Sequence, residues 1–111
     1  MEISYEDFRK VNIHVGTVIS VEENRKARKP ALVLEIDFGS SICMKKTSTQ
    51  ITDYYNMNNL IEKQVIAVCN FPSKNIAGFK SEILVLGAME KDGKVVLIHQ
   101  SKKVANGLEI I

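Results

Sequence analysis

The sequence has few of the residues that support disulfide, metal or membrane chemistry. Its two cysteines, Cys43 and Cys69, stand alone in separate apolar runs, which predicts reduced, buried thiols. No Cys-X-X-Cys pair or His/Cys cluster occurs, so we expect no zinc site. No apolar run reaches the roughly 18 residues of a membrane-spanning helix. Residues 1–10 are acidic and amphipathic, unlike a signal peptide, and we expect a cytoplasmic protein.

Side chains suited to catalysis are also scarce. His14 and His99 are the only side chains that titrate near neutral pH; His14 has no catalytic-type carboxylate nearby in sequence, and His99 follows an apolar strand. Glu35 and Asp37 could form an acid pair on one strand face, but solvent-facing charges beside a basic connection explain them more simply. The sequence has no glycine-rich phosphate loop. We therefore expect a non-catalytic protein that needs no cofactor and no metal.

The composition that remains is that of an ordinary globular protein. With 111 residues, 45% hydrophobic and 25% charged, the chain is expected to form one domain, 1–111, with its own core. A net charge of +2 does not by itself imply a nucleic-acid partner, but local charge density sets the field that a polyanion meets. The cations gather in the connection 22–30 and in two pairs: Arg25, Lys26, Arg28, Lys29, Lys45, Lys46, Lys102 and Lys103.

The first half of the chain predicts a short helix and three strands. Ser4 and Asp7 have the spacing of a capping box, and the helix is expected to turn Tyr5, Phe8 and Val11 inward. Apolar and polar residues alternate along residues 11–21 up to Gly16, and the glycine predicts a bulged, curled first strand. A half-buried second strand at 32–38 leads through a turn at 38–40 into a third at 41–46.

The second half predicts short helices, two buried strands and a hairpin. Residues 47–63 lack alternation and predict one or two short helices, whose packing residues are Ile51, Tyr54, Leu60 and Ile61. The apolar runs 65–68 and 83–86 predict strands buried on both faces. An Asp-Gly turn at 92–93 predicts a hairpin into 95–98. This order predicts an all-β OB-fold, a five-stranded Greek-key barrel with short helices and terminal extensions.

A polar, basic and aromatic segment separates the two buried strands. Ring faces beside lysines and amides suit an RNA backbone and its unstacked bases, whereas the simpler alternative is a core hairpin with a solvated loop. The amide of Asn70 is either a loop cap or a recognition group, and Phe71 and Phe79 are either core side chains or stacking surfaces. The segment also supplies Lys74, Lys80, Ser81 and Glu82.

The end of the third strand offers further polar groups to the same expected face. Ammonium groups contact phosphates, and hydroxyl and amide groups bond to sugars or base edges. The residues are Lys45, Lys46, Ser48 and Gln50.

Several blocks of the sequence together resemble the tRNA-binding-domain family, over residues 5 to 109. They are VNIHVGTVISVE, ARKPALVLEIDFG, ICMKKTSTQIT, KQVIAVCNFPSKNIAGFKSEILVLG and the terminal VANG. Relatives occur free or appended to methionyl- and tyrosyl-tRNA synthetases, where they bind tRNA by shape. The ARKP block replaces the His-Pro of many of these relatives and favours a free-standing branch of homodimeric, export-related chaperones.

The resemblance carries expectations about assembly and about the site. It implies a two-fold dimer built by the terminal segments 1–10 and 99–111, with Phe8 as a contact. It implies a pocket near Asn70, Phe71, Ser81 and Glu82, with basic contacts from Arg28, Lys29, Lys45 and Lys46. The family usually has Asp then Arg where this chain has Asn12 and His14, so no family role passes to those two positions.

Three functions follow as hypotheses. The first is binding of tRNA or another structured RNA, through Arg28, Lys29, Lys45, Lys46, Ser48, Gln50, Asn70, Lys74, Lys80 and Ser81. The second is a chaperone that holds unfolded or export-destined precursor polypeptides in an apolar pocket with a basic rim, formed by Asn70, Phe71, Phe79, Ser81 and Glu82. The third is a dimeric module whose partner is another protein. An apolar pocket with a basic rim serves either of the first two partners, so the sequence separates them poorly.

Overall fold

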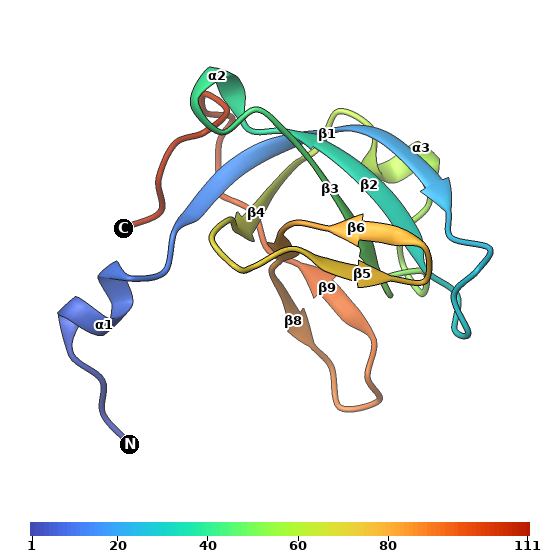
Figure 1. The fold of residues 1–111 in the computed structure, drawn as a ribbon, viewed down its shortest axis with the longest axis horizontal. Helices are drawn as coiled ribbons and strands as arrows, with labels where there is room; N and C mark the ends of the chain where they lie inside the picture. Colours follow the sequence, from blue (N-terminus) through green and yellow to red (C-terminus); the bar gives the residue numbers. More distant parts are fainter.

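Five antiparallel strands curl into a nearly closed barrel in the computed structural model, which describes residues 1–111 (Figure 1). The strand order is β3-β2-β1-β4-β7. Beyond the paired strands, the Glu82 N–H donates to the Lys46 carbonyl over 2.9 Å, which links the segment before β7 to β3. The expected all-β OB-type barrel is therefore confirmed. Its strands are β1 (Ile13–Glu23), β2 (Leu32–Asp37), β3 (Met44–Thr49), β4 (Gln64–Val68) and β7 (Leu84–Val85).

Three short helices and two hairpins complete the fold. The helices are α1 (Tyr5–Arg9), α2 (Gly39–Ile42) and α3 (Met57–Leu60), and α3 lies between β3 and β4 in the chain as predicted. One hairpin pairs β8 (Gly87–Met89) with β9 (Val95–Leu97), which confirms the Asp-Gly turn. The other pairs β5 (Lys74–Ile76) with β6 (Phe79–Ser81). The segment between the two predicted buried strands is therefore itself a hairpin.

The first strand bends where its pairing changes partner. Residues 13–17 pair with β4, and residues 17–23 pair with β2. The register shifts between Val18 and Ser20, so the predicted bulge exists but lies three residues beyond Gly16. Gly16 is needed for a different reason, since a Cβ there would lie 2.7 Å from Ile36 and 2.8 Å from the Phe38 ring. The glycine marks close packing on the core rather than the bulge.

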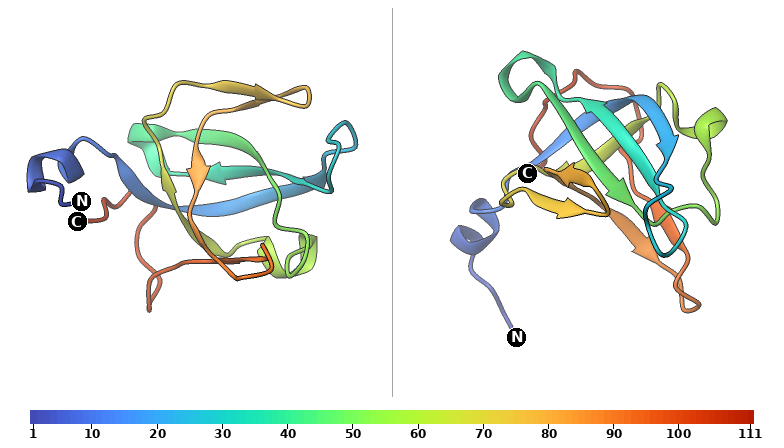
Figure 2. Two further views of the ribbon diagram at one scale, coloured as in Figure 1. Left: turned by 90° about the horizontal axis from the view of Figure 1, so that it is seen from below. Right: turned by 45° about the vertical axis from the view of Figure 1, so that its right-hand side comes forward.

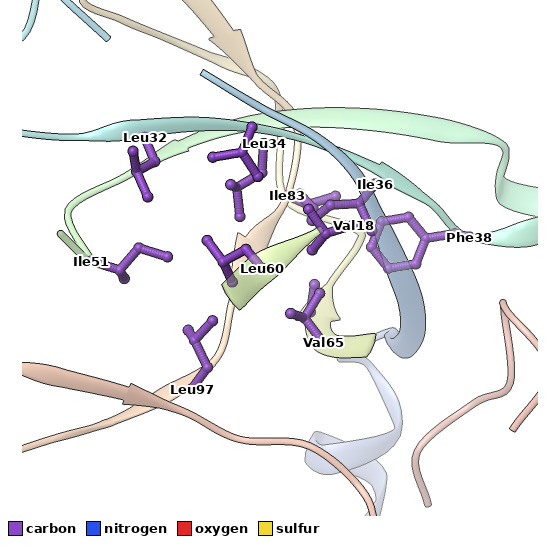
Figure 3. Packing of buried hydrophobic residues seen from close by; sticks show 12 residues of the cluster. Val18, Leu32, Leu34, Ile36, Phe38, Ile51, Leu60, Val65, Ile83 and Leu97 are labelled. Carbon is purple, nitrogen blue, oxygen red and sulfur yellow. The ribbon is translucent and has the colours of Figure 1, made fainter. Parts of the chain in front are cut away.

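The core lies inside the barrel and under α3 (Figure 3). Alternate residues of β2 point into it, and Leu34 and Ile36 are fully buried together with Phe38. Val33 is buried too, so the second strand is more enclosed than the half-buried strand predicted. Ile51 and Leu60 pack in the same cluster, as predicted. The rest of the cluster is Val18, Val21, Leu32, Val65, Ala67, Ile83 and Leu97.

Helix α1 does not pack on the core, contrary to the prediction. Its capping box is present: the Ser4 hydroxyl accepts from the Asp7 N–H, and the Asp7 carboxylate accepts from the Ser4 N–H, each at 3.1 Å. The helix nevertheless extends away from the barrel (Figure 1), and Tyr5 is 71% exposed. Val11 is exposed as well. The expectation that these side chains turn inward is wrong because no part of this chain covers that face.

The third strand begins later than predicted because the β2–β3 connection is a helical turn. α2 occupies residues 39–42, and Cys43 ends it with φ at 71°. Cys43 is therefore exposed rather than buried. Residues 44–49 form the strand, so Thr47–Thr49 are not helical, and α3 is the single helix of that region. Tyr54 is exposed instead of packing.

The two apolar runs around the central hairpin differ in their burial. The first, β4, is buried along Val65–Val68 as predicted. The second contains only the two-residue strand β7, where Leu84 is 49% exposed, so burial on both faces is wrong for 83–86. The barrel is open at this edge, where Leu84 and Val85 of β7 line a groove.

The C-terminal segment returns along the free side of β1. The Val15 N–H donates to the Leu108 carbonyl over 3.0 Å, and the Ile110 N–H donates to the Ile13 carbonyl over 2.8 Å. His14 lies beneath this segment, where its Nδ1 donates to the Gly107 carbonyl over 2.9 Å. Gly107, at φ +92°, sits where a Cβ would lie 2.4 Å from the Phe38 carbonyl oxygen. No helix is long and apolar enough to cross a membrane.

Candidate nucleic-acid interface

An open groove of about 560 Å³ lies between β3, the segment 71–74 and the chain from β6 to β7. Apolar walls come from both sides: Phe71, Ile76, Ile83, Leu84 and Val85. Phe71 is 54% exposed, so its ring is available to a ligand. Of the predicted site residues, the structure brings Ser48, Phe71, Lys74, Ser81 and Glu82 together around this groove.

Ser81 and Thr47 fix the floor of the groove. Both side chains are buried, and their hydroxyl oxygens lie 2.7 Å apart in a hydrogen bond. The Thr47 hydroxyl also approaches the Ile83 carbonyl at 3.2 Å. These bonds join β6 and the following residues to β3, because buried hydroxyls need partners. Ser81 thus has a structural role in shaping the groove.

Carboxylates of this chain already pair with the two lysines of β3. Lys45 Nζ lies 3.6 Å from Glu82 Oε2, and Lys46 Nζ lies 3.8 Å from Glu35 Oε2. The Lys46–Glu35 pair follows from strand register, since these residues face each other across the β2–β3 ladder. Each carboxylate lowers the positive potential that its lysine presents to a polyanion. The lysines of β3 therefore present less positive potential than their sequence position suggests.

Four other predicted cations have no such partner, and one of them, Lys74, lines the groove. Arg28 and Lys29 lie on the β1–β2 connection, and Lys74 and Lys80 lie on the β5–β6 hairpin. All four are exposed, and none belongs to an ion pair. Unpaired cations on two neighbouring loops can all face one polyanionic partner.

The β1–β2 connection is held in place by a buried asparagine. Asn24 Nδ2 donates to Ser48 Oγ over 2.9 Å, and Asn24 Oδ1 accepts from the Lys26 N–H over 3.2 Å. The Lys26 side chain then lies against Gly78 of the β5–β6 turn. The basic connection is thereby fixed to β3 and to the hairpin. Asn24 was not among the residues predicted from the sequence, although an asparagine that opens a turn is a known signal for such a local bond.

The remaining predicted residues lie apart from the groove or serve the fold. Phe79 lines a separate hollow with Arg25 and Met57, so the two phenylalanines do not form one surface. Gln50 is exposed just beyond β3. The amide of Asn70 is engaged on both sides: its Oδ1 accepts from the Asn12 N–H over 2.9 Å, and its Nδ2 donates to the Lys10 carbonyl over 2.7 Å. Asn70 therefore connects the end of β4 to the segment after α1.

The titratable groups with altered pKa values lie away from the free cations. Burial raises the pKa of the Cys69 thiol to about 11, against an opposing effect of Lys45. A hydrogen bond to Glu90 raises the pKa of Tyr54 to about 12. No three His, Cys, Asp or Glu side chains gather as metal ligands would. The chemistry available around the groove is that of charge, hydrogen bonding and apolar contact.

Comparison with protein families gives a match over most of the chain. Residues 13–109 match the family model described as "Putative tRNA binding domain". The chain is 35% identical over 109 residues to the methionine–tRNA ligase of Porphyromonas gingivalis strain W83, a match that covers 98% of this chain and 16% of that protein. The chain thus spans about one-sixth of the length of the curated relatives it matches.

Solved structures match the whole fold. The chain is 47% identical to the chaperone CsaA from Bacillus anthracis str. Ames, with a TM-score of 0.94 and full coverage of both chains. It is 45% identical to the CsaA chaperone protein from Picrophilus torridus, with a TM-score of 0.91 and coverage of 99% and 100%. A MetRS-related protein from Pyrococcus horikoshii is 29% identical, with a TM-score of 0.87 and full coverage of both chains. With its barrel, its basic loops and these matches, the chain belongs to the tRNA-binding-domain family.

Proposed function

We propose that this protein is a non-catalytic, cytoplasmic module that binds tRNA or another structured RNA. The observation that carries the proposal is the set of unpaired cations, Arg28, Lys29, Lys74 and Lys80, on two loops that contact each other, with Lys74 lining the groove. Membership of the tRNA-binding-domain family supports the same partner. RNA affinity comes largely from cations that neutralise phosphates, and these four have no competing carboxylate in an ion pair.

The arrangement favours recognition of shape over sequence. The cations lie on loops whose relative positions are held by Asn24 and by the contact of Lys26 with Gly78, so they match one spacing of phosphates. Exposed Phe71 offers a stacking surface for one unpaired base at most. Lys45 and Lys46 contribute less than the loop cations because Glu82 and Glu35 pair with them.

The terminal segments suit a homodimer. Helix α1 and the end of the chain are joined by Arg9 and Glu109, whose charged atoms lie 3.3 Å apart. They leave apolar side chains uncovered on the outside: Ile3, Tyr5, Val11, Leu108 and Ile111. A second copy that covers this surface would remove it from water. Two basic surfaces in one rigid dimer would bind a folded RNA with higher avidity than either alone.

A polypeptide-binding chaperone is the second candidate, favoured by the apolar walls of the groove. Phe71 and Leu84 are about half exposed and both line the groove, so apolar surface is available there. An extended apolar segment of an unfolded precursor could bury its side chains there. The similarity to two structures named as CsaA chaperones supports this candidate.

The two candidates differ in what holds the ligand, so paired variants separate them. We would titrate the protein with bulk tRNA and with a reduced, unfolded polypeptide. The double variant Arg28→Ala/Lys29→Ala should weaken tRNA binding at least tenfold and leave polypeptide binding within twofold. Phe71→Ala should do the reverse under the chaperone hypothesis.

A charge-matched control removes two exposed lysines elsewhere, Lys10→Ala/Lys91→Ala. It should change neither affinity by more than twofold. Equal tRNA affinity for the control and for Arg28→Ala/Lys29→Ala would contradict the RNA-binding proposal as we place it.

A further inference from the structure

A second pocket, of about 580 Å³, lies on the opposite side of the barrel from the groove. It is bounded by α3, by the start of β4 and by residues 99–103, which follow β9. In the left panel of Figure 2, the β5–β6 hairpin lies at the top and α3, beside the chain after β9, at the bottom. A ligand in this pocket would therefore not touch the groove.

The rim of this pocket is basic. Lys63, Lys102 and Lys103 line it, all three are exposed, and none belongs to an ion pair. Glu62 is the only carboxylate among the lining residues. Three lysines against one glutamate give this small area a net charge of +2, equal to that of the whole chain. Such a concentration attracts an anion.

The floor of the pocket is apolar. The core residues Leu60, Val65 and Leu97 lie beneath it (Figure 3), and the less buried Tyr55 and Val96 complete the apolar lining. A free phosphate or a run of carboxylates could use the lysines but would gain nothing from this floor. A ligand that fits both parts has a charged end and a flat, weakly hydrated body.

The pocket wall contains hydrogen-bonding capacity that the chain itself does not use. Gln100 Nε2 donates to Gln64 Oε1, so this side chain is held within the chain itself. The Tyr55 hydroxyl oxygen accepts from the Leu97 N–H over 2.8 Å, which leaves its proton free to donate. The edge of a nucleobase presents both donors and acceptors.

We propose that this pocket binds a nucleotide of single-stranded RNA, with its base over the apolar floor and its flanking phosphates against Lys63, Lys102 and Lys103. A nucleotide joins a planar base to a phosphate, which is the combination that the floor and the rim require. Duplex RNA is excluded because its bases are stacked and paired inside the helix. The proposal rests on the proposed RNA-binding function, and it adds a separate contact for an unpaired segment or end of the same RNA.

The test uses the full chain in an Arg28→Ala/Lys29→Ala background, so that these two cations of the β1–β2 connection no longer contribute to RNA affinity. The probe is a fluorescein-labelled single-stranded RNA pentanucleotide, followed by fluorescence anisotropy. Lys102→Ala/Lys103→Ala should weaken its binding at least tenfold, whereas the control Lys10→Ala/Lys91→Ala should change it less than twofold. The slope of log affinity against log salt should fall by about 1.4 for the pocket variant, since each phosphate contact on a single strand contributes roughly 0.7.

Competition separates the base from the phosphate. Adenosine monophosphate should displace the pentanucleotide at a concentration at least tenfold lower than ribose 5-phosphate does. A ten-residue polyglutamate peptide and a blunt RNA duplex should compete poorly. Equal competition by ribose 5-phosphate, or tighter binding of polyglutamate, would overturn the nucleotide assignment.

Failure of this proposal is distinguishable from failure of the proposed function. If Lys102→Ala/Lys103→Ala matches the control for the pentanucleotide, the pocket proposal is wrong, whatever folded tRNA does. If instead Arg28→Ala/Lys29→Ala leaves tRNA binding intact, the proposal that the loop cations bind RNA is wrong. The pentanucleotide result still decides whether the pocket binds a nucleotide.

Discussion

Glu35 pairs with Lys46 on the face where we place RNA, and its removal should strengthen RNA binding. Most substitutions in a binding surface weaken it, so a predicted gain is an informative test. The change is Glu35→Gln, which keeps the size of the side chain and removes the charge. The structure predicts a gain because Glu35 both neutralises Lys46 and repels a phosphate that approaches it.

The magnitude follows from the distance between the charges. At 3.8 Å, the attraction between Lys46 Nζ and Glu35 Oε2 is about 1 kcal/mol in a water-like dielectric. Both side chains are partly exposed, so the pair itself adds at most about 1 kcal/mol to stability. If binding must overcome this attraction, Glu35→Gln should tighten RNA binding by about 1 kcal/mol, a factor of roughly five.

The assay is anisotropy of labelled tRNA at low salt, with wild type, Glu35→Gln and a matched control. The control is Asp92→Asn, because Asp92 also pairs with a lysine, Lys94, but lies on the β8–β9 hairpin, away from α1 and the chain end. Both variants change the net charge by the same amount. Equal affinities for Glu35→Gln and Asp92→Asn would refute the reasoning, since only overall charge would then matter.

Three further outcomes are expected. Gly107→Ala should lower the free energy of unfolding in urea by more than about 2 kcal/mol, because the new side chain meets both a positive φ and a backbone clash. The control Gly93→Ala has φ +90° but no neighbour within 4 Å, and it should cost only about 1–2 kcal/mol. Equal losses of stability in the two variants would contradict this. At pH 8, iodoacetamide should modify the exposed Cys43 before Cys69. The pKa of Cys69 is about 11, so only about one Cys69 thiol in a thousand is ionised at this pH. Equal modification rates of the two cysteines would contradict this prediction. The hydrogen bond from the backbone N–H of Ser4 lowers the pKa of Asp7 below its ordinary value of 3.8. Protection of the α1 amides against hydrogen exchange should therefore be complete above pH 3.8 and fall as the pH drops through the lowered pKa. Asp7→Asn should abolish that pH dependence.

The elements that could be predicted from sequence are those set by local chemistry. The Ser4–Asp7 capping box and the Asp-Gly hairpin at 92–93 need only neighbouring residues, and both are present. The alternation of β2 and the position of one helix between β3 and β4 were enough to indicate the barrel. Features that depend on contacts between residues near in sequence were therefore predicted correctly.

Features that depend on distant contacts could not be predicted. A turn at 38–40 would place Cys43 opposite Glu35, whereas the helical turn α2 shifts the register and places Lys46 there. The pairing of Lys46 with Glu35 could therefore not be predicted from the sequence. The orientation of α1 was mispredicted for a related reason, since an amphipathic pattern does not say whether its partner lies in the same chain. The roles of Asn70 and Ser81 in holding the fold likewise emerge only from tertiary contacts.

The salt dependence of tRNA binding by the wild-type protein tests the central claim most directly. If the four unpaired loop cations each neutralise one phosphate, they should contribute about −3 to −4 to the slope of log affinity against log salt, and Arg28→Ala/Lys29→Ala should reduce its magnitude by about 1.4 to 1.8. A steep slope that falls by this amount is the result the account predicts. A slope near zero, or one unchanged in the double variant, would contradict it and would make polypeptide binding in the groove the primary function.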